Sequence, residues 1–113
     1  MKLVSFEGIG QVLATFEAEE GVREGQVVKV SGPGRAAPCA DGEPVAGVAA
    51  AVRDGCVSVQ LSGCAAVQAS GVEPGWVKLS ADGKGGMKRD DTAGRAYLVV
   101  DQDSAGGTVT VLL

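Results

Sequence analysis

The chain contains no histidine, and this absence removes the residue on which much enzyme chemistry depends. Histidine is the usual general base beside a serine or cysteine nucleophile, and it completes many zinc sites. Lysine or a carboxylate could act as the base instead, but no spacing in the sequence marks such a pair. The sequence therefore predicts a protein that is not an enzyme, with no catalytic residues, no cofactor and no metal site.

Basic charge and long apolar runs are also scarce. Ten lysines and arginines stand against 14 aspartates and glutamates, a formal net charge of −4. A nucleic-acid-binding face would need a basic surface with stacking aromatics. No apolar run reaches about 18 residues, and Ser5 and Glu7 interrupt the N-terminal apolar residues. We expect a soluble protein that is not secreted and binds neither nucleic acid nor membrane.

Three cysteines form an odd set without a C-x-x-C pair: Cys39, Cys56 and Cys64. Since no histidine can complete a zinc site, we expect free thiols that are buried or chemically neutral, in a reducing cytosol. The alternative is an enzyme that uses Cys56 or Cys64 as its nucleophile.

Aromatic residues make up only 4% of the chain, although 45% of it is apolar. The core must therefore consist mainly of valine, alanine and leucine, which bury little area each, at about 25 cal/mol per Å². Such a thin core would gain from oligomerisation or docking. We expect Trp76 and Tyr97 to be buried, because few other large side chains can fill the interior.

The 18 glycines and four prolines divide the chain into short segments and leave little room for helices. Alternating apolar residues and turn signals predict seven to nine short strands in a small, single-domain, all-β barrel or sandwich with little or no helix. Residues 11–113 form this domain, and residues 1–10 are either an N-terminal arm or a first strand. The expected strands cover residues 11–18, 26–31, 35–40, 45–53, 56–61, 64–69, 76–79, 95–101 and 107–113.

Turn chemistry suggests how some of these strands pair. Asp54-Gly55 is a two-residue hairpin signal between the strands at 45–53 and 56–61. Residues 45–53 are small and apolar on both faces, which suits a central strand or one covered by a neighbouring subunit. Residues 11–18 and 26–31 could form another hairpin, and residues 35–40 a proline-tolerant edge strand.

Two glycine-rich stretches and two acidic clusters invite functional interpretations, but each departs from the required pattern. Residues 82–86 lack the order of a phosphate-binding loop, and residues 8–14 lack the third glycine of a dinucleotide fingerprint. The acidic residues at 90–91 and 101–103 lack the spacing of a calcium loop. All four are best interpreted as turns or solvated surface.

Five segments, each a strand beside a glycine turn, together cover most of residues 24–100. They are EGQVVKVS at 24–31, DGEPVAGV at 41–48, GWVKL at 75–79, DG at 82–83 and GRAYLVV at 94–100. In combination they resemble a family of small bacteriophage capsid decoration, or cement, proteins, which fold as compact β-barrels on the outside of the head. No catalytic residues are carried over.

The resemblance implies a non-enzymatic virion protein that binds the shell of the major capsid protein and stabilises it against internal pressure. It also implies a homo-oligomer, with a trimer favoured, and a location in the bacterial cytoplasm during assembly and then on the capsid exterior. The alternatives are a tail or baseplate β module and a cytosolic barrel that binds a small molecule in an internal cavity.

The first ten residues supply the candidate shell contacts. Val4, Phe6 and Ile9 precede the first clear strand and can be exposed. An arm of this kind can add to a partner's sheet. The competing interpretation is that this segment is simply the first strand of the barrel.

Overall fold

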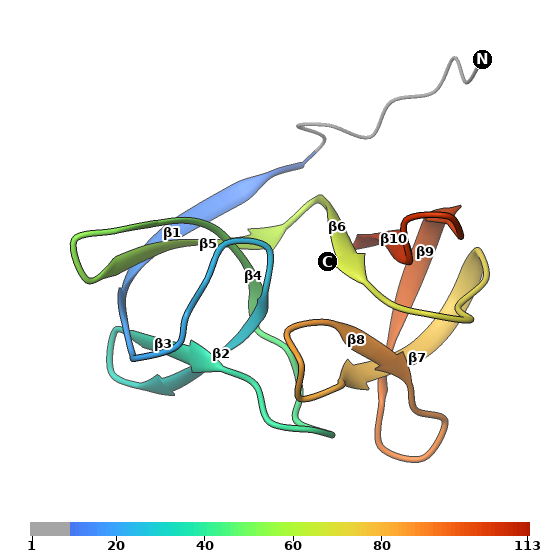
Figure 1. The fold of residues 1–113 in the computed structure, drawn as a ribbon, viewed down its shortest axis with the longest axis horizontal. Coiled ribbons are helices and arrows are strands. Elements are labelled where there is room, and N and C mark those ends of the chain that lie inside the picture. Colours follow the sequence, from blue (N-terminus) through green and yellow to red (C-terminus); the bar gives the residue numbers. More distant parts are fainter. Residues whose placement is uncertain (1–9) are drawn as a thin grey trace.

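The computed structural model describes residues 10–113, which form ten strands in two sheets without a helix (Figure 1). The prediction of a small all-β protein is confirmed. The strands are β1 Val12–Ala18, β2 Val27–Gly32, β3 Arg35–Pro38, β4 Gly47–Arg53, β5 Cys56–Ser62, β6 Cys64–Gln68, β7 Gly75–Ala81, β8 Met87–Arg89, β9 Arg95–Asp103 and β10 Thr108–Leu112.

The first five strands close into a barrel in the order β1-β3-β2-β4-β5, and antiparallel pairing of β1 with β5 completes the ring. The β4–β5 hairpin forms at the predicted turn, where Asp54 and Gly55 have φ angles of 53° and 76°. Two successive residues with positive φ are the requirement of the turn that best matches the twist of paired strands. This hairpin was therefore predictable from two residues.

The expected hairpin between β1 and β2 is wrong, because β1 pairs with β3 and β5 while β2 pairs with β3 and β4. The connection between them carries Val22, which is buried in the cluster inside the barrel. Because the connection must reach the barrel interior to bury Val22, it does not form the tight turn that a hairpin needs. The edge position expected for β3 is also wrong, since closure places β3 between β1 and β2.

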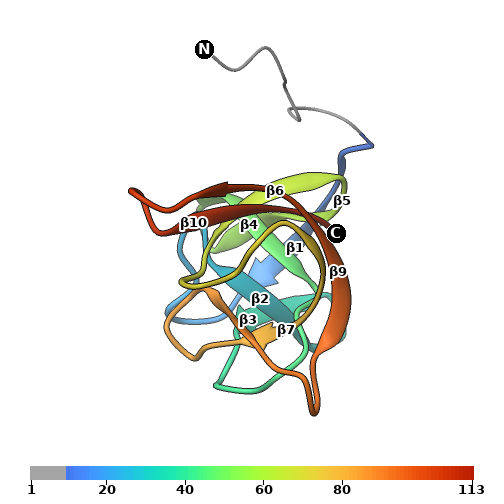
Figure 2. The same ribbon diagram turned by 90° about the vertical axis from the view of Figure 1, so that its right-hand side faces the viewer.

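The last five strands form a second, open sheet in the order β6-β10-β9-β7-β8. It lies beside the barrel, as the two views show (Figures 1 and 2). The closed barrel therefore takes in only half of the strands. The short strand β8 was not predicted from the sequence, because three residues are too few to show an alternating pattern.

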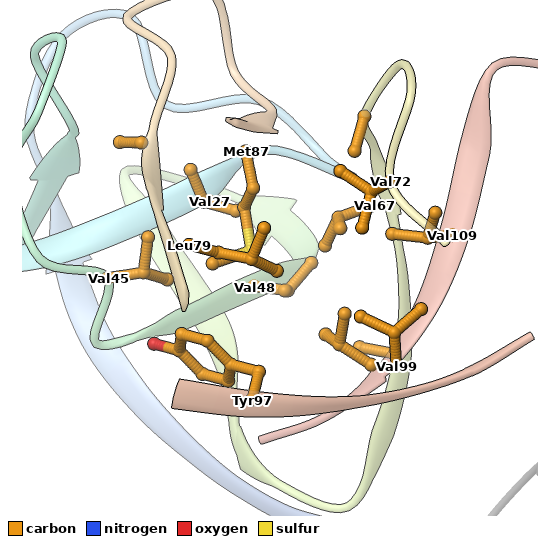
Figure 3. Close-up of a cluster of buried hydrophobic side chains, with 14 of the residues drawn as sticks. Val27, Val45, Val48, Val67, Val72, Leu79, Met87, Tyr97, Val99 and Val109 are labelled. Atoms are coloured by element: carbon orange, nitrogen blue, oxygen red, sulfur yellow. The ribbon is translucent and has the colours of Figure 1, made fainter. Parts of the chain in front are cut away.

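Two hydrophobic clusters stabilise this arrangement. One fills the barrel and contains only valine and alanine among its fully buried members: Val22, Val28, Ala36, Ala49, Val57 and Val59. The other lies where the barrel meets the second sheet and contains the larger side chains Leu79, Met87 and Tyr97 (Figure 3). The neighbours Val27 and Val28 contribute to different clusters, since successive side chains of a strand point to opposite faces.

The central position predicted for residues 45–53 is confirmed, because β4 lies between β2 and β5. Val48 belongs to the cluster against the second sheet and Ala49 to the cluster inside the barrel. This explains why the strand is apolar on both faces. A Cβ atom at Gly47 would lie 2.3 Å from the carbonyl oxygen of Gln60, so only glycine fits where β4 approaches β5.

Candidate functional site

An apolar row crosses four strands on the outer face of the second sheet. Trp76 of β7 is paired in register with Leu98 of β9, Leu98 with Leu112 of β10, and Leu112 with Cys64 of β6. Trp76 is 74% exposed and Leu112 39% exposed, while Leu98 and Cys64 are half-buried. We call these four residues the outer row. Figure 2 turns the side of the molecule that carries β7, β9 and β10 towards the viewer.

The outer row faces away from the core because the strands alternate. Val77, Tyr97 and Val111 belong to the cluster against the barrel, so their neighbours in the strands point outwards. The burial predicted for Tyr97 is confirmed at 3% exposure, but the burial predicted for Trp76 is wrong. The sequence did indicate that Trp76 is exposed, because Trp76 lies on the same face of the strand as the charged Lys78.

A groove of about 540 Å³ opens beside Trp76. The connection before β7 forms one wall, and residues at and after the end of β8 form the other. Its lining residues are Gly71, Val72, Glu73, Pro74, Trp76, Val77, Lys78, Arg89 and Asp91. An exposed indole next to a groove is a common anchor at protein interfaces, because tryptophan buries a large area on contact.

The charges around the groove are only partly paired. Arg89 Nε lies 3.3 Å from Asp91 Oδ2, and both side chains are well exposed. Glu73 and Lys78 line the groove without an ion pair or hydrogen bond of their side chains to any residue from 10 to 113. Trp76 therefore lies between two unpaired charges, the negative charge of Glu73 and the positive charge of Lys78.

Asp90, next to this groove, has a structural role. Its carboxylate accepts hydrogen bonds from the Ser80 hydroxyl at 2.8 Å and from the backbone N–H of Ala93 at 2.9 Å. These bonds, that of Ala93 first, hold the pKa of Asp90 below its ordinary value. The carboxylate fixes the turn that follows β8, in agreement with the interpretation of residues 90–91 as turn charges.

The glycine-rich turn at residues 82–86 is closed by its own aspartate. Asp82 Oδ1 accepts hydrogen bonds from the backbone N–H groups of Lys84 at 2.7 Å and Gly86 at 3.0 Å. A phosphate-binding loop needs such N–H groups for its ligand. Here they already have an acceptor, so the turn interpretation is favoured by the structure.

The three cysteines are free thiols in different environments. Cys39 is buried, Cys64 half-buried and Cys56 exposed. Burial raises the pKa of the Cys39 thiol to about 11, which keeps it protonated at neutral pH. The prediction of a buried or neutral thiol therefore holds for Cys39, whereas the exposure of Cys56 was not foreseen.

The candidate shell contacts Val4, Phe6 and Ile9 lie outside the described residues. Within residues 10–113, no group of three or more cysteine, aspartate or glutamate side chains is placed to hold a metal ion. That part of the chain also has no helix long and apolar enough to cross a membrane. No protein-family model and no curated protein matches this sequence.

Proposed function

We propose that this chain is a non-enzymatic virion structural protein that binds the outside of a capsid shell as a homo-oligomer and stabilises the shell. The observation that supports this proposal is the outer row, an apolar strip across a sheet face in which Trp76 and Leu112 are exposed. Contiguous exposed apolar surface of this kind marks sites of protein contact.

The composition of the core supports the same function. The cluster inside the barrel contains only valine and alanine among its fully buried residues, so it buries little area per residue. A protomer of this kind gains stability when its outer face is covered. On a shell with many equivalent positions, several weak contacts per oligomer add up to tight binding.

Light scattering of the purified protein, followed by co-sedimentation with empty heads of the phage that encodes it, tests the proposal. We expect a closed oligomer that pellets with the heads. Trp76→Ala should reduce the pelleted fraction, because it removes the largest exposed member of the outer row. Lys84→Glu, in the turn at residues 82–86, serves as a surface control. A folded protein that stays in the supernatant with heads would contradict the proposal.

A tail or baseplate module is the second candidate, since the same outer row would serve contact with a tail protein. Pelleting with isolated tails but not with heads would favour it. A small-molecule-binding barrel with an internal cavity receives less support. Its interior is occupied by valine and alanine side chains, and the groove beside Trp76 lies on the second sheet.

A further inference from the structure

Part of β1 has an open edge. β1 pairs with β5 from Val12 to Glu17, but it pairs with β3 only at Glu17 and Ala18. The turn from β2 into β3 ends just before Arg35, so the first residues of β1 extend past β3 (Figure 1). On that side, no residue from 10 to 113 pairs with residues 12–16. An exposed strand edge offers backbone groups to which another strand can add.

Leu13 and Thr15 direct their backbone groups to this edge. The Glu17 N–H donates to the Gly34 carbonyl on the β3 side, whereas the next N–H, that of Ala18, donates to the β4–β5 turn. Successive residues of a strand alternate in this respect, and the register with β5 is regular from Leu13 to Glu17. The N–H and C=O groups of Leu13 and Thr15 therefore have no partner on this side among residues 10–113.

The side chains of this stretch do not protect its edge. Open edges are commonly blocked by charged side chains or proline. Residues 12–16 read VLATF and contain neither, and Val12 and Leu13 are 52% and 49% exposed. The unpaired part of β7 differs, because Pro74 comes just before it and Lys78 lies at its other end. The edge of β1 is therefore the less protected of the two.

The open stretch is matched to a second copy of itself. In an antiparallel pair centred on Ala14, Leu13 of each copy lies opposite Thr15 of the other, so all the free N–H and C=O groups find partners. A register centred on Leu13 or on Thr15 would pair only half of these groups within the open stretch. Val12 lies opposite Phe16 of the other copy, and no charged side chain is brought into the contact.

The ends of the stretch limit this pair to the same length. Glu17 is already bonded to Gly34, which blocks a longer pair. β1 begins at Val12, and Gly10 has a φ of 60°, so a partner strand centred on Ala14 ends where this block begins. The pair joins β1 and β5 of both copies in one sheet. The outer row lies on the second sheet and stays available for further contacts.

We propose that two copies of this chain associate through residues 12–16 of β1, paired antiparallel about a two-fold axis at Ala14. This inference rests on the proposed function and deepens it, because it names a contact that joins copies in the homo-oligomer. The backbone groups of Leu13 and Thr15 form the hydrogen bonds of the contact. The exposed side chains of Val12 and Leu13 are covered by the second copy.

Charge pairs across the axis test the contact. Leu13→Lys/Thr15→Lys places lysine opposite lysine at two positions, and Leu13→Glu/Thr15→Glu does the same with glutamate. Each variant should raise the dissociation constant of the oligomer about tenfold, because like charges directly opposite destabilise a strand pair. An equal mixture of the two proteins should associate again, since lysine then faces glutamate at both positions. Light scattering across a dilution series measures all three.

Two matched controls accompany this test. Leu13→Lys/Thr15→Glu changes the same positions, but its lysine faces the glutamate of the other copy in the pair centred on Ala14. It should associate more tightly than either like-charged variant, whereas a parallel pair in register would bring its like charges together. Glu20→Lys makes the same change of net charge as the double lysine variant, at an exposed position outside β1, and should leave the dissociation constant unchanged. Circular dichroism confirms that each variant is folded.

Amide hydrogen exchange of the wild type, followed by NMR, gives a second signal from the backbone itself. The N–H groups of Leu13 and Thr15 should exchange slowly in a concentrated sample and fast after dilution, because the second copy protects them. The N–H groups of Ala14 and Phe16 face β5 and should be protected at both concentrations.

Several results would overturn the inference. These are a wild-type monomer at all concentrations, like-charged variants that associate like wild type, or a mixture that stays dissociated. An oligomer in which Leu13 and Thr15 exchange fast would assign association to another surface, such as the outer row. The proposed function fails separately. If the variants behave as expected but no protein pellets with heads, the contact between copies stands and shell binding falls. If the wild type pellets while the variants associate like wild type, shell binding stands and this contact falls.

Discussion

The two sheets of this chain differ in their edges, because one is closed into a barrel and the other is open. The barrel closes β1 on β5, so all five of its strands have two neighbours. The second sheet ends in β6 and β8, leaves part of β7 unpaired and exposes the outer row. Closure removes sites for further strands, whereas an open sheet keeps them. The open edge of β7 and the exposed Trp76 therefore both lie in the half that did not close, while the barrel keeps an open edge where β1 extends past β3.

Truncation of one core residue in each half should have the largest effect on stability. Leu79→Ala, in the cluster between the barrel and the second sheet, should lower the free energy of unfolding by about 3 kcal/mol. Val57→Ala, inside the barrel, should cost about 2 kcal/mol, because it removes fewer carbons. Urea denaturation measures both. A larger loss for Val57 would mean that the barrel carries more of the stability.

Gly47→Ala should lower the free energy of unfolding by about 2 kcal/mol, because its Cβ would lie 2.3 Å from the Gln60 carbonyl oxygen. Gly32→Ala is the matched control, since nothing lies within 4 Å of a Cβ built there and its φ is ordinary. It should change stability by less than about 0.5 kcal/mol. Thermal unfolding distinguishes the two. Equal effects would show that β4 can move away from β5.

Acid should weaken the link between β2 and the connection that follows β3. Lys29 Nζ lies 2.9 Å from Glu43 Oε1, and the Ala40 N–H donates to the same oxygen. These bonds, that from Lys29 first, lower the pKa of Glu43 from its ordinary 4.5. A lowered carboxyl pKa adds stability above the ordinary value, and this stability is lost as the pH falls through the folded-state pKa.

The melting temperature of the wild type should therefore fall more steeply below about pH 4.5 than that of Glu43→Gln. The two proteins should be compared at several pH values from 3 to 7, roughly the range over which carboxyl groups titrate. Parallel curves would show that the ion pair contributes no pH dependence.

Trp76→Ala should have the smallest effect on folding, less than about 0.5 kcal/mol, because the indole is 74% exposed. Its effect should fall on association instead, as a higher dissociation constant in light scattering. A large loss of stability without a change in association would show that the indole serves the fold and would argue against a binding role for the outer row.

Most of the strands could be predicted from the sequence because their signals are local. Alternating apolar residues identify β5 and β10, and Asp54-Gly55 identifies the hairpin between β4 and β5. The candidate site was less predictable. Trp76 was assigned to the core on its size alone, although Lys78 on the same face of β7 indicated an outward position.

Composition and alternation specify an all-β chain whose core is built mainly from small apolar side chains, because both signals act within a few residues. Three features follow from long-range packing instead: β1 closes on β5, the remaining strands form a separate sheet, and β8 pairs with only part of β7. Such pairings join strands far apart in the chain. These pairings depend on which strand faces can be buried against each other, and this cannot be predicted from a local sequence pattern.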